Sequence, residues 1–64
     1  MYRLNFYNGD VSLGFVLIQH DDYVALGTCN VKETIEYLDR NCILDTYILN
    51  YMNGCVTHTE VLHV

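Results

Sequence analysis

Three cysteines and three histidines are the residues of this chain whose chemistry suits a metal site or a reactive thiol. The candidate zinc ligands are Cys55, His58 and His63, with Cys29 or Cys42 as the fourth. Cys55 and His58 are an odd number of positions apart, which places them on opposite faces of a strand. No Cys-x-x-Cys pair is present either. We therefore expect no metal and no cofactor, with Cys42 in the core and the histidines on the surface.

A thiol-dependent reaction is the second chemical possibility. Cys29 directly precedes Asn30, a candidate helix cap, and His20 is a possible neighbouring base. A half-buried thiol where a strand meets a helix explains the same pattern without catalysis, and we favour that interpretation. The sequence contains no glycine-rich phosphate loop, no nucleophile elbow and no His-Glu-x-x-His motif. We expect the protein not to be an enzyme.

The chain is acidic, with a formal net charge of −5 in 64 residues. Acidic side chains outnumber basic ones by eight to three, which makes direct binding to nucleic acid the least favoured mode. No run of about eighteen apolar residues is present, and strand-like alternation begins right after Met1, so we expect neither a membrane partner nor a secretory signal. The odd cysteine count fits reduced thiols, and the expected compartment is the cytoplasm, or the host cytoplasm for a viral protein.

The first structural element expected is a hairpin turned at Asn8-Gly9, which lies between two alternating apolar runs. The predicted pairs of its apolar face are Phe6 with Val11, Leu4 with Leu13, and Tyr2 with Phe15. Those of its polar face are Tyr7 with Asp10, Asn5 with Ser12, and Arg3 with Gly14. Residues 15–18 are continuously apolar, which predicts a strand end covered on both faces and hence a second interface.

A short third strand, Tyr23 to Leu26, and then a helix follow in the expected order. The helix begins at Asn30, where Asn30 and Glu33 have the spacing of a capping box. Its apolar stripe consists of Val31, Ile35, Leu38 and Cys42. The opposite side carries alternating charges and is interpreted as a solvated face.

The last expected element is a hairpin with strands Thr46 to Met52 and Cys55 to Val64, turned at Asn53-Gly54. Both of its faces mix apolar and polar residues, so we expect one against the helix and the other partly covered by a partner. The predicted fold is a single α+β domain, residues 1–64, with an antiparallel sheet of four to five strands and one helix on one face. The order hairpin, helix, hairpin resembles that of the β-grasp immunoglobulin-binding domains, a resemblance that implies a fold and no function.

Binding to another protein is the function that the sequence favours. Hydrophobic residues make up 52% of the chain, more than a domain of this size usually hides, and six are tyrosines. We expect Tyr2 in the core, Tyr7 and Tyr37 exposed, and Tyr47 or Tyr51 in a contact surface. The candidate partner-binding residues are Asp10, Asp21, Asp22, Asp45, Tyr47, Tyr51 and Glu60.

The predicted function is that of a small acidic inhibitor or adaptor that occupies a basic site on a nucleic-acid-handling or defence protein. In size and charge the chain is similar to viral or mobile-element proteins that block host machinery. A homodimer or larger homo-oligomer is also expected. The alternative function is a homo-oligomer that binds a small, nucleotide-like ligand between its subunits, because 64 residues can hardly enclose a ligand pocket alone.

Overall fold

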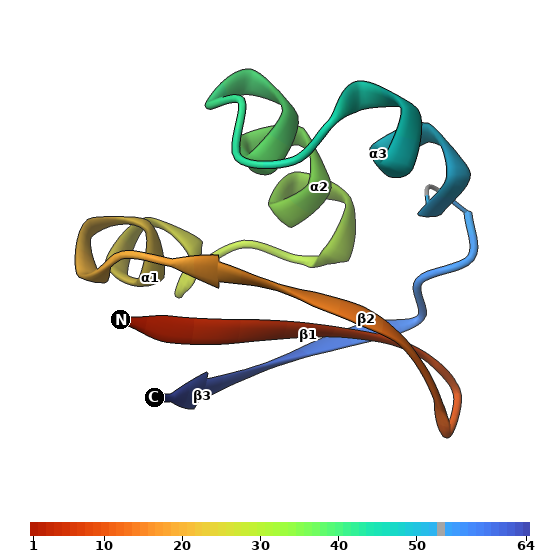
Figure 1. The fold of residues 1–64 in the computed structure, drawn as a ribbon, viewed down its shortest axis with the longest axis horizontal. Helices are drawn as coiled ribbons and strands as arrows, with labels where there is room; N and C mark the ends of the chain where they lie inside the picture. The colour runs from red at the N-terminus through yellow and green to blue at the C-terminus, as the bar shows by residue number, and fades with distance from the viewer. Residues whose placement is uncertain (53) are drawn as a thin grey trace.

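The computed structural model describes residues 1–52 and 54–64 as an α+β fold in which three helices cover one face of a three-stranded antiparallel sheet (Figure 1). The sheet order is β2-β1-β3, so the strand nearest the N-terminus is central. The elements are β1 (Tyr2–Asn8), β2 (Val11–Ile18), α1 (His20–Leu26), α2 (Val31–Arg40), α3 (Thr46–Met52) and β3 (His58–His63). The coarse α+β prediction is confirmed, whereas the sheet of four to five strands and the single helix are not.

The first hairpin forms as expected, but its turn lies one residue later than predicted. Asn8 pairs with Val11, which leaves Gly9 and Asp10 as the turn. Gly9 has a φ of 56°, and glycine at the first central position is the signature of a type II′ hairpin turn. The residue with the left-handed backbone is therefore Gly9, and Asn8 is the last residue of β1.

A bulge in β2 then changes which residues share a face. The pairing of β1 with β2 shifts between Phe6 and Tyr7, which leaves Leu13 opposite no partner of its own. Beyond the bulge Asn5 pairs with Phe15, and Arg3 pairs with Leu17. The predicted pairs were therefore wrong, because one extra residue in a strand moves every later side chain to the other face.

Helix α2 begins where the capping box predicted it. The side chain of Asn30 accepts a hydrogen bond from the Glu33 backbone N–H at 2.9 Å, and Glu33 Oε1 accepts one from the Asn30 backbone N–H at 3.3 Å. Two of the predicted apolar positions, Ile35 and Leu38, are buried. The predicted core position of Cys42 was wrong, because the helix ends at Arg40 and Cys42 is exposed with a left-handed φ of 55°.

The predicted strand from Tyr23 to Leu26 is instead the second half of helix α1. A capping box joins Gln19 and Asp22 at its start, and the Gln19 backbone N–H donates to Asp22 Oδ2 at 3.3 Å. The helix is only seven residues long, and Leu26 is its one buried residue. A four-residue apolar run carries too little periodicity to separate strand from helix, which is why the prediction failed.

The second predicted hairpin does not form, because Thr46–Met52 is helix α3. Leu49 and Met52, three positions apart, are its buried residues, a helical spacing. The last strand, β3, is shorter than predicted and pairs with β1 instead, with Val61 opposite Leu4. Asn53 of the predicted turn lies outside the described residues. The element order therefore departs from that of the β-grasp domains.

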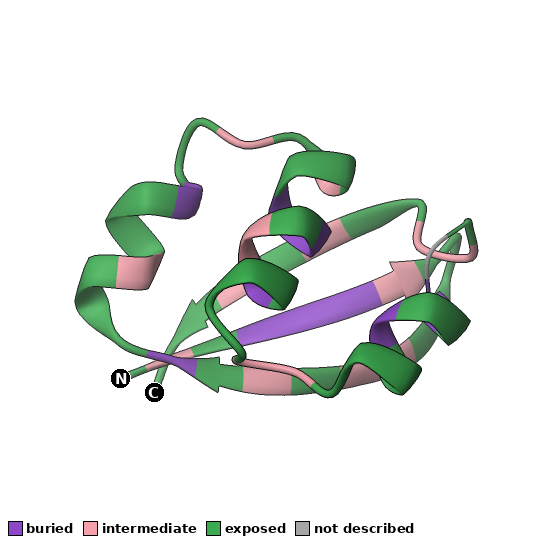
Figure 2. Ribbon diagram, turned by 90° about the horizontal axis from the view of Figure 1, so that it is seen from above, coloured by how far each residue is buried: buried purple, intermediate pink, exposed green. Residues whose placement is uncertain are grey.

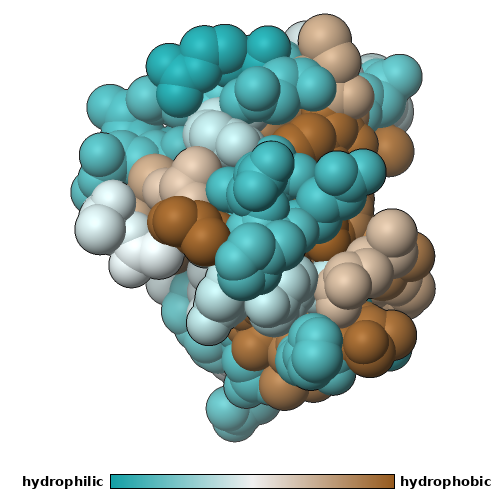
Figure 3. Space-filling model, turned by 90° about the vertical axis from the view of Figure 1, so that its left-hand side faces the viewer, coloured by the Kyte–Doolittle hydropathy of each residue, from teal (hydrophilic) through white to brown (hydrophobic). Residues whose placement is uncertain are grey.

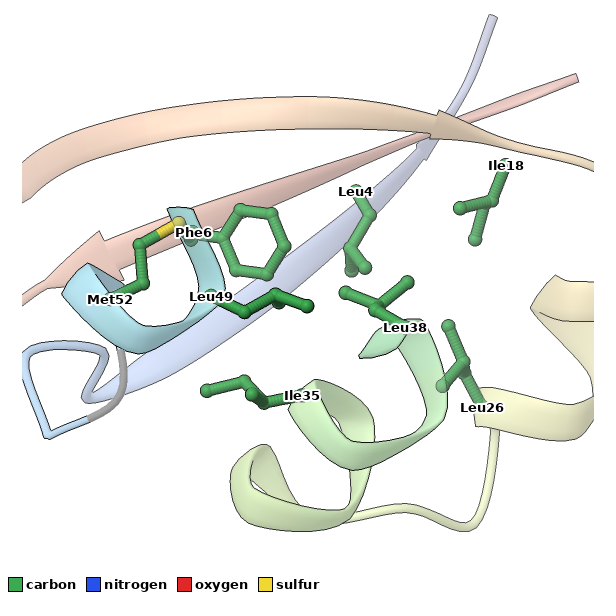
Figure 4. Packing of buried hydrophobic residues seen from close by; sticks show 8 residues of the cluster. All are labelled: Leu4, Phe6, Ile18, Leu26, Ile35, Leu38, Leu49 and Met52. Atoms are coloured by element: carbon green, nitrogen blue, oxygen red, sulfur yellow. The ribbon is translucent and has the colours of Figure 1, made fainter. Parts of the chain in front are cut away.

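The hydrophobic core lies between the sheet and the helices. Five of the six described elements contribute buried side chains, namely β1, β2, α1, α2 and α3 (Figure 4). The core residues are Leu4, Phe6, Ile18, Leu26, Ile35, Leu38, Leu49 and Met52. Seen from the helical side, buried positions concentrate along β1 and on the inward sides of the helices (Figure 2). Tyr2, predicted to be in the core, is half-buried against it. Among residues 1–52 and 54–64, no helix combines the length and apolar character needed to cross a bilayer.

Candidate interaction surfaces

Two of the predicted partner-binding acids accept hydrogen bonds that stabilise helices. Asp45 Oδ1 accepts a hydrogen bond from the Tyr47 backbone N–H at 2.8 Å, as an N-cap of α3 does. Asp22 caps α1 with Oδ2 and accepts the Tyr37 hydroxyl on Oδ1 at 2.8 Å. These hydrogen bonds fix the direction of both carboxylates, and Asp45 remains exposed to solvent.

The bond between Tyr37 and Asp22 ties helix α2 to helix α1. Tyr37, expected to be exposed, is half-buried. The hydrogen bond to Asp22, burial and the nearby negative charges of Asp22 and Asp21 together raise the Tyr37 pKa above its ordinary value, with Arg40 opposing them weakly. Each of these effects disfavours the phenolate, so the neutral hydroxyl is held as the donor.

The remaining predicted acids do not form a cluster. Asp10 lies in the turn between β1 and β2, and Asp21 lies in the first turn of α1. These two elements occupy opposite ends of the molecule (Figure 1). Glu60 lies in the middle of β3. The negative charge is thus spread over several faces, and the fold does not bring the five predicted partner-binding acids together into one acidic patch.

Helix α3 carries the most exposed aromatic side chains of the chain. Tyr47 is 80% exposed and Tyr51 73%, and Ile48 beside them is also exposed. The tyrosines are four positions apart, so they share one side of the helix. Thr46 at the start of α3 donates to Asp39 Oδ1 at 3.3 Å, which adds a second acid beside Asp45. We call Asp39, Asp45, Tyr47, Ile48 and Tyr51 the α3 surface.

The face of the sheet turned away from the helices is a second surface. The apolar run at residues 15–18 predicted cover on both faces of this end of β2, but the described chain covers one face only, and Phe15 and Leu17 are exposed on the other. Its large apolar side chains are Phe15, Leu17 and Leu62, each about half exposed at 52%, 48% and 48%. The predicted register assigned polar partners to this face, and the bulge in β2 is what brings two apolar residues there. We call this the open face; it consists of Arg3, Asn5, Tyr7, Ser12, Phe15, Leu17, His58, Glu60 and Leu62.

Arg3 organises the centre of the open face. Its guanidinium carbon lies 3.8 Å from the centre of the Phe15 ring, a cation–π contact. Its Nε donates to Asn5 Oδ1 at 3.0 Å, and Asn5 is only 6% exposed. Tyr7, half-buried where exposure was expected, stacks on His58 with ring centres 4.9 Å apart. The open face is therefore ordered by its own side-chain contacts.

A tyrosine–histidine cluster joins the two chain ends to α1. Tyr2 stacks on Tyr23 with centroids 4.1 Å apart and planes 3° apart, and His63 tilts against Tyr2 at 5.1 Å. Tyr2 Oη and His20 Nδ1 are hydrogen-bonded at 3.0 Å. On the end of the molecule seen in Figure 3, hydrophobic areas alternate with hydrophilic side chains. The cluster thus joins β1, β3 and α1 through ring contacts.

The described residues do not assemble the chemistry that the cysteines and histidines suggested. Among residues 1–52 and 54–64, no group of three or more potential metal ligands lies together. The Cys29 thiol donates to the Ala25 carbonyl oxygen at 3.5 Å, while His20 is bonded to Tyr2. Cys29 and Cys55 are half-buried. The exposed side chains of α3 and of the open face are therefore the candidate functional features.

Comparison with protein-family models, with curated proteins and with solved structures finds no significant match for this chain. No relative therefore supplies a substrate, ligand or partner. The surfaces described above carry the functional argument.

Proposed function

We propose that this chain is a small acidic protein-binding module that acts as an inhibitor or adaptor by occupying a basic surface on another protein. A nucleic-acid-handling or defence protein is the kind of partner that presents such a surface, because phosphate-binding sites are basic. The observation that carries the proposal is the exposure of Tyr47 and Tyr51 on a helix without a single charged residue.

Tyrosine is enriched in protein interfaces because it offers a large rigid contact area and a polar tip at little conformational cost. Asp39 and Asp45 lie beside the tyrosines and supply negative charge at the rim. The net charge of −5 adds long-range attraction for a basic partner. Aromatic anchors with an acidic rim provide affinity from the centre and fast association from the edge.

The proposal is tested by affinity capture with the tagged chain, after nuclease treatment, followed by identification of the captured proteins. We expect basic proteins that are lost with the double variant Tyr47→Ala, Tyr51→Ala. With the purified partner, the variant should bind at least about 30-fold more weakly, as for hot-spot tyrosines. Association should also slow as salt increases.

The matched control is Val24→Ala, which removes a 63% exposed apolar side chain from α1. It should bind as the unaltered chain does. Loss of binding in both variants, or in neither, would contradict the proposal. Circular dichroism of each variant establishes that the fold is intact, since truncating exposed side chains costs little stability.

The alternative function, a small nucleotide-like ligand bound between subunits, places its site in an assembly. No cavity is found in the described part of the single chain. Ligand absorbance carried through purification, or a ligand-dependent rise in melting temperature, would favour this function over the first.

A further inference from the structure

The open face is the largest surface of the sheet that no part of the described chain covers. All three helices lie on the other side (Figure 1). Phe15, Leu17 and Leu62 nevertheless expose about half of their surface here, which is unusual for large side chains in the middle of strands. An uncovered sheet face of this kind is a docking surface, and its charges identify the occupant.

The charges on the open face favour a second copy of this chain as its occupant. The chain carries eight acidic side chains against three basic ones, and two copies repel each other where acids meet. The open face differs, because it carries one cation, Arg3, and one acid, Glu60. These are balanced and lie on adjacent strands, since Glu60 pairs with Asn5, two positions along β1 from Arg3. A face with one charge of each sign can complement itself.

The strand register provides the geometry for this complementarity. Arg3, Leu17 and Leu62 lie at one level across the sheet. Asn5, Phe15 and Glu60 lie at the level two residues further along. A twofold axis that crosses the strands at the level of Leu4 exchanges these two levels between copies that face each other.

Under that rotation each strand lies over its own copy and runs in the opposite direction. Phe15 then lies over Leu17 of the second copy, and Leu17 lies over its Phe15. Arg3 lies over the second copy's Asn5. The second copy's Glu60 is on the neighbouring strand, about 4.8 Å from that Asn5, and is within reach of the arginine side chain. The contacts are reciprocal, as a twofold interface requires.

We propose that the open face binds a second copy of this chain through a twofold, face-to-face sheet packing, with Phe15 against Leu17 and Arg3 beside Glu60 of the second copy. Three strands of six to eight residues present a smaller area than the about 800 Å² per partner of a standard interface. The dimer is therefore weak and concentration-dependent. It leaves α3 free, so the proposed binding to a basic partner does not depend on it.

The test is a charge exchange followed by sedimentation from about 10 µM to about 1 mM, the range in which weak interfaces assemble. The unaltered chain should shift from one to two copies over this range. Arg3→Glu and Glu60→Arg should each weaken the dimer at least about tenfold, because like charges then meet. The double exchange Arg3→Glu, Glu60→Arg restores opposite signs and should recover dimerisation to within about threefold.

Controls separate the interface from general charge and folding effects. Lys32→Glu on α2 changes the net charge by the same amount as Arg3→Glu and should leave the dimer unaltered. Leu17→Lys should abolish it, and a melting temperature for each variant verifies the fold. A chain that stays monomeric at about 1 mM overturns the proposal. So does a dimer insensitive to Leu17→Lys, or a double exchange that binds no better than its parents. Capture of a basic partner by the monomeric Leu17→Lys variant would keep the two proposals distinguishable.

Discussion

Strand β1 serves two faces of one sheet, and the two faces are built on different principles. Leu4 and Phe6 point toward the helices and are each 1% exposed. Arg3 and Tyr7 point to the open face, where contacts run sideways between neighbouring strands. The face covered by the helices, which we call the closed face, gains its stability from burial, whereas the open face leaves apolar side chains exposed. One strand of a short chain thus packs alternate side chains into the core and presents the others on an uncovered face.

The two faces should differ most in the stability that each loses when its phenylalanine is truncated. Phe6→Ala should lower the free energy of unfolding by about 3–5 kcal/mol, because the cavity forms in the centre of the core. A domain of this size has about 5 kcal/mol in total, which leaves about 0–2 kcal/mol, so the variant should be near its unfolding midpoint in little or no urea. Phe15→Ala should cost about 1 kcal/mol or less, since the ring is half exposed. Urea denaturation at low protein concentration measures both.

Low concentration matters because association would add to the apparent stability of the unaltered chain. Phe6→Leu, which keeps most of the volume and should cost about 1 kcal/mol, gives a measurable value if the alanine variant does not fold. Equal losses for Phe6→Ala and Phe15→Ala would contradict the assignment of one face to folding and the other to contact.

Sequence reasoning succeeded where the signal was local and complete. Helix α2 has its cap, its apolar stripe and its charged side within one stretch, so its start at Asn30 could be predicted. The first hairpin was also predictable, because Asn8-Gly9 leaves few alternatives. The position of its turn was not, since Asn-Gly and Gly-Asp both fit a two-residue loop.

The open face could not have been found from alternation alone. A single unpaired residue at Leu13 reverses the alternation of β2, and nothing in the local sequence requires it. Helix α3 was missed because seven residues rich in β-branched and aromatic types also fit a strand. Its helical state depends on the core that Leu49 and Met52 enter, which is tertiary information. The tyrosines Tyr47 and Tyr51 were predicted as contact residues and are exposed, although on a helix.

A smaller loss of stability is expected at the N-cap of α2, one of the helices that cover the core. Asn30→Ala removes the side-chain acceptor for the Glu33 backbone N–H and should cost about 1 kcal/mol. The control Asn50→Ala, at an exposed position of α3, should change stability by less than about 0.5 kcal/mol. Thermal denaturation of the two variants compares them. A loss at Asn30 no larger than that at Asn50 would mean that the capping box does not stabilise α2.

The smallest effect concerns the bond that joins the two helices over the closed face. Because the Tyr37 pKa is raised in the folded chain, the neutral hydroxyl is stabilised by folding. This contribution is fully present below the ordinary tyrosine pKa of about 10 and is lost as pH rises through the higher folded value. Tyr37→Phe lacks it at every pH. The stability difference between the unaltered chain and Tyr37→Phe should therefore be constant from about pH 7 to pH 9 and shrink at higher pH.

Tyr51→Phe, which alters an exposed tyrosine, controls for the other phenols and should show no such change. A difference that grows with pH would mean that the phenolate, not the hydroxyl, faces Asp22, and the link between α1 and α2 would then have to be sought elsewhere.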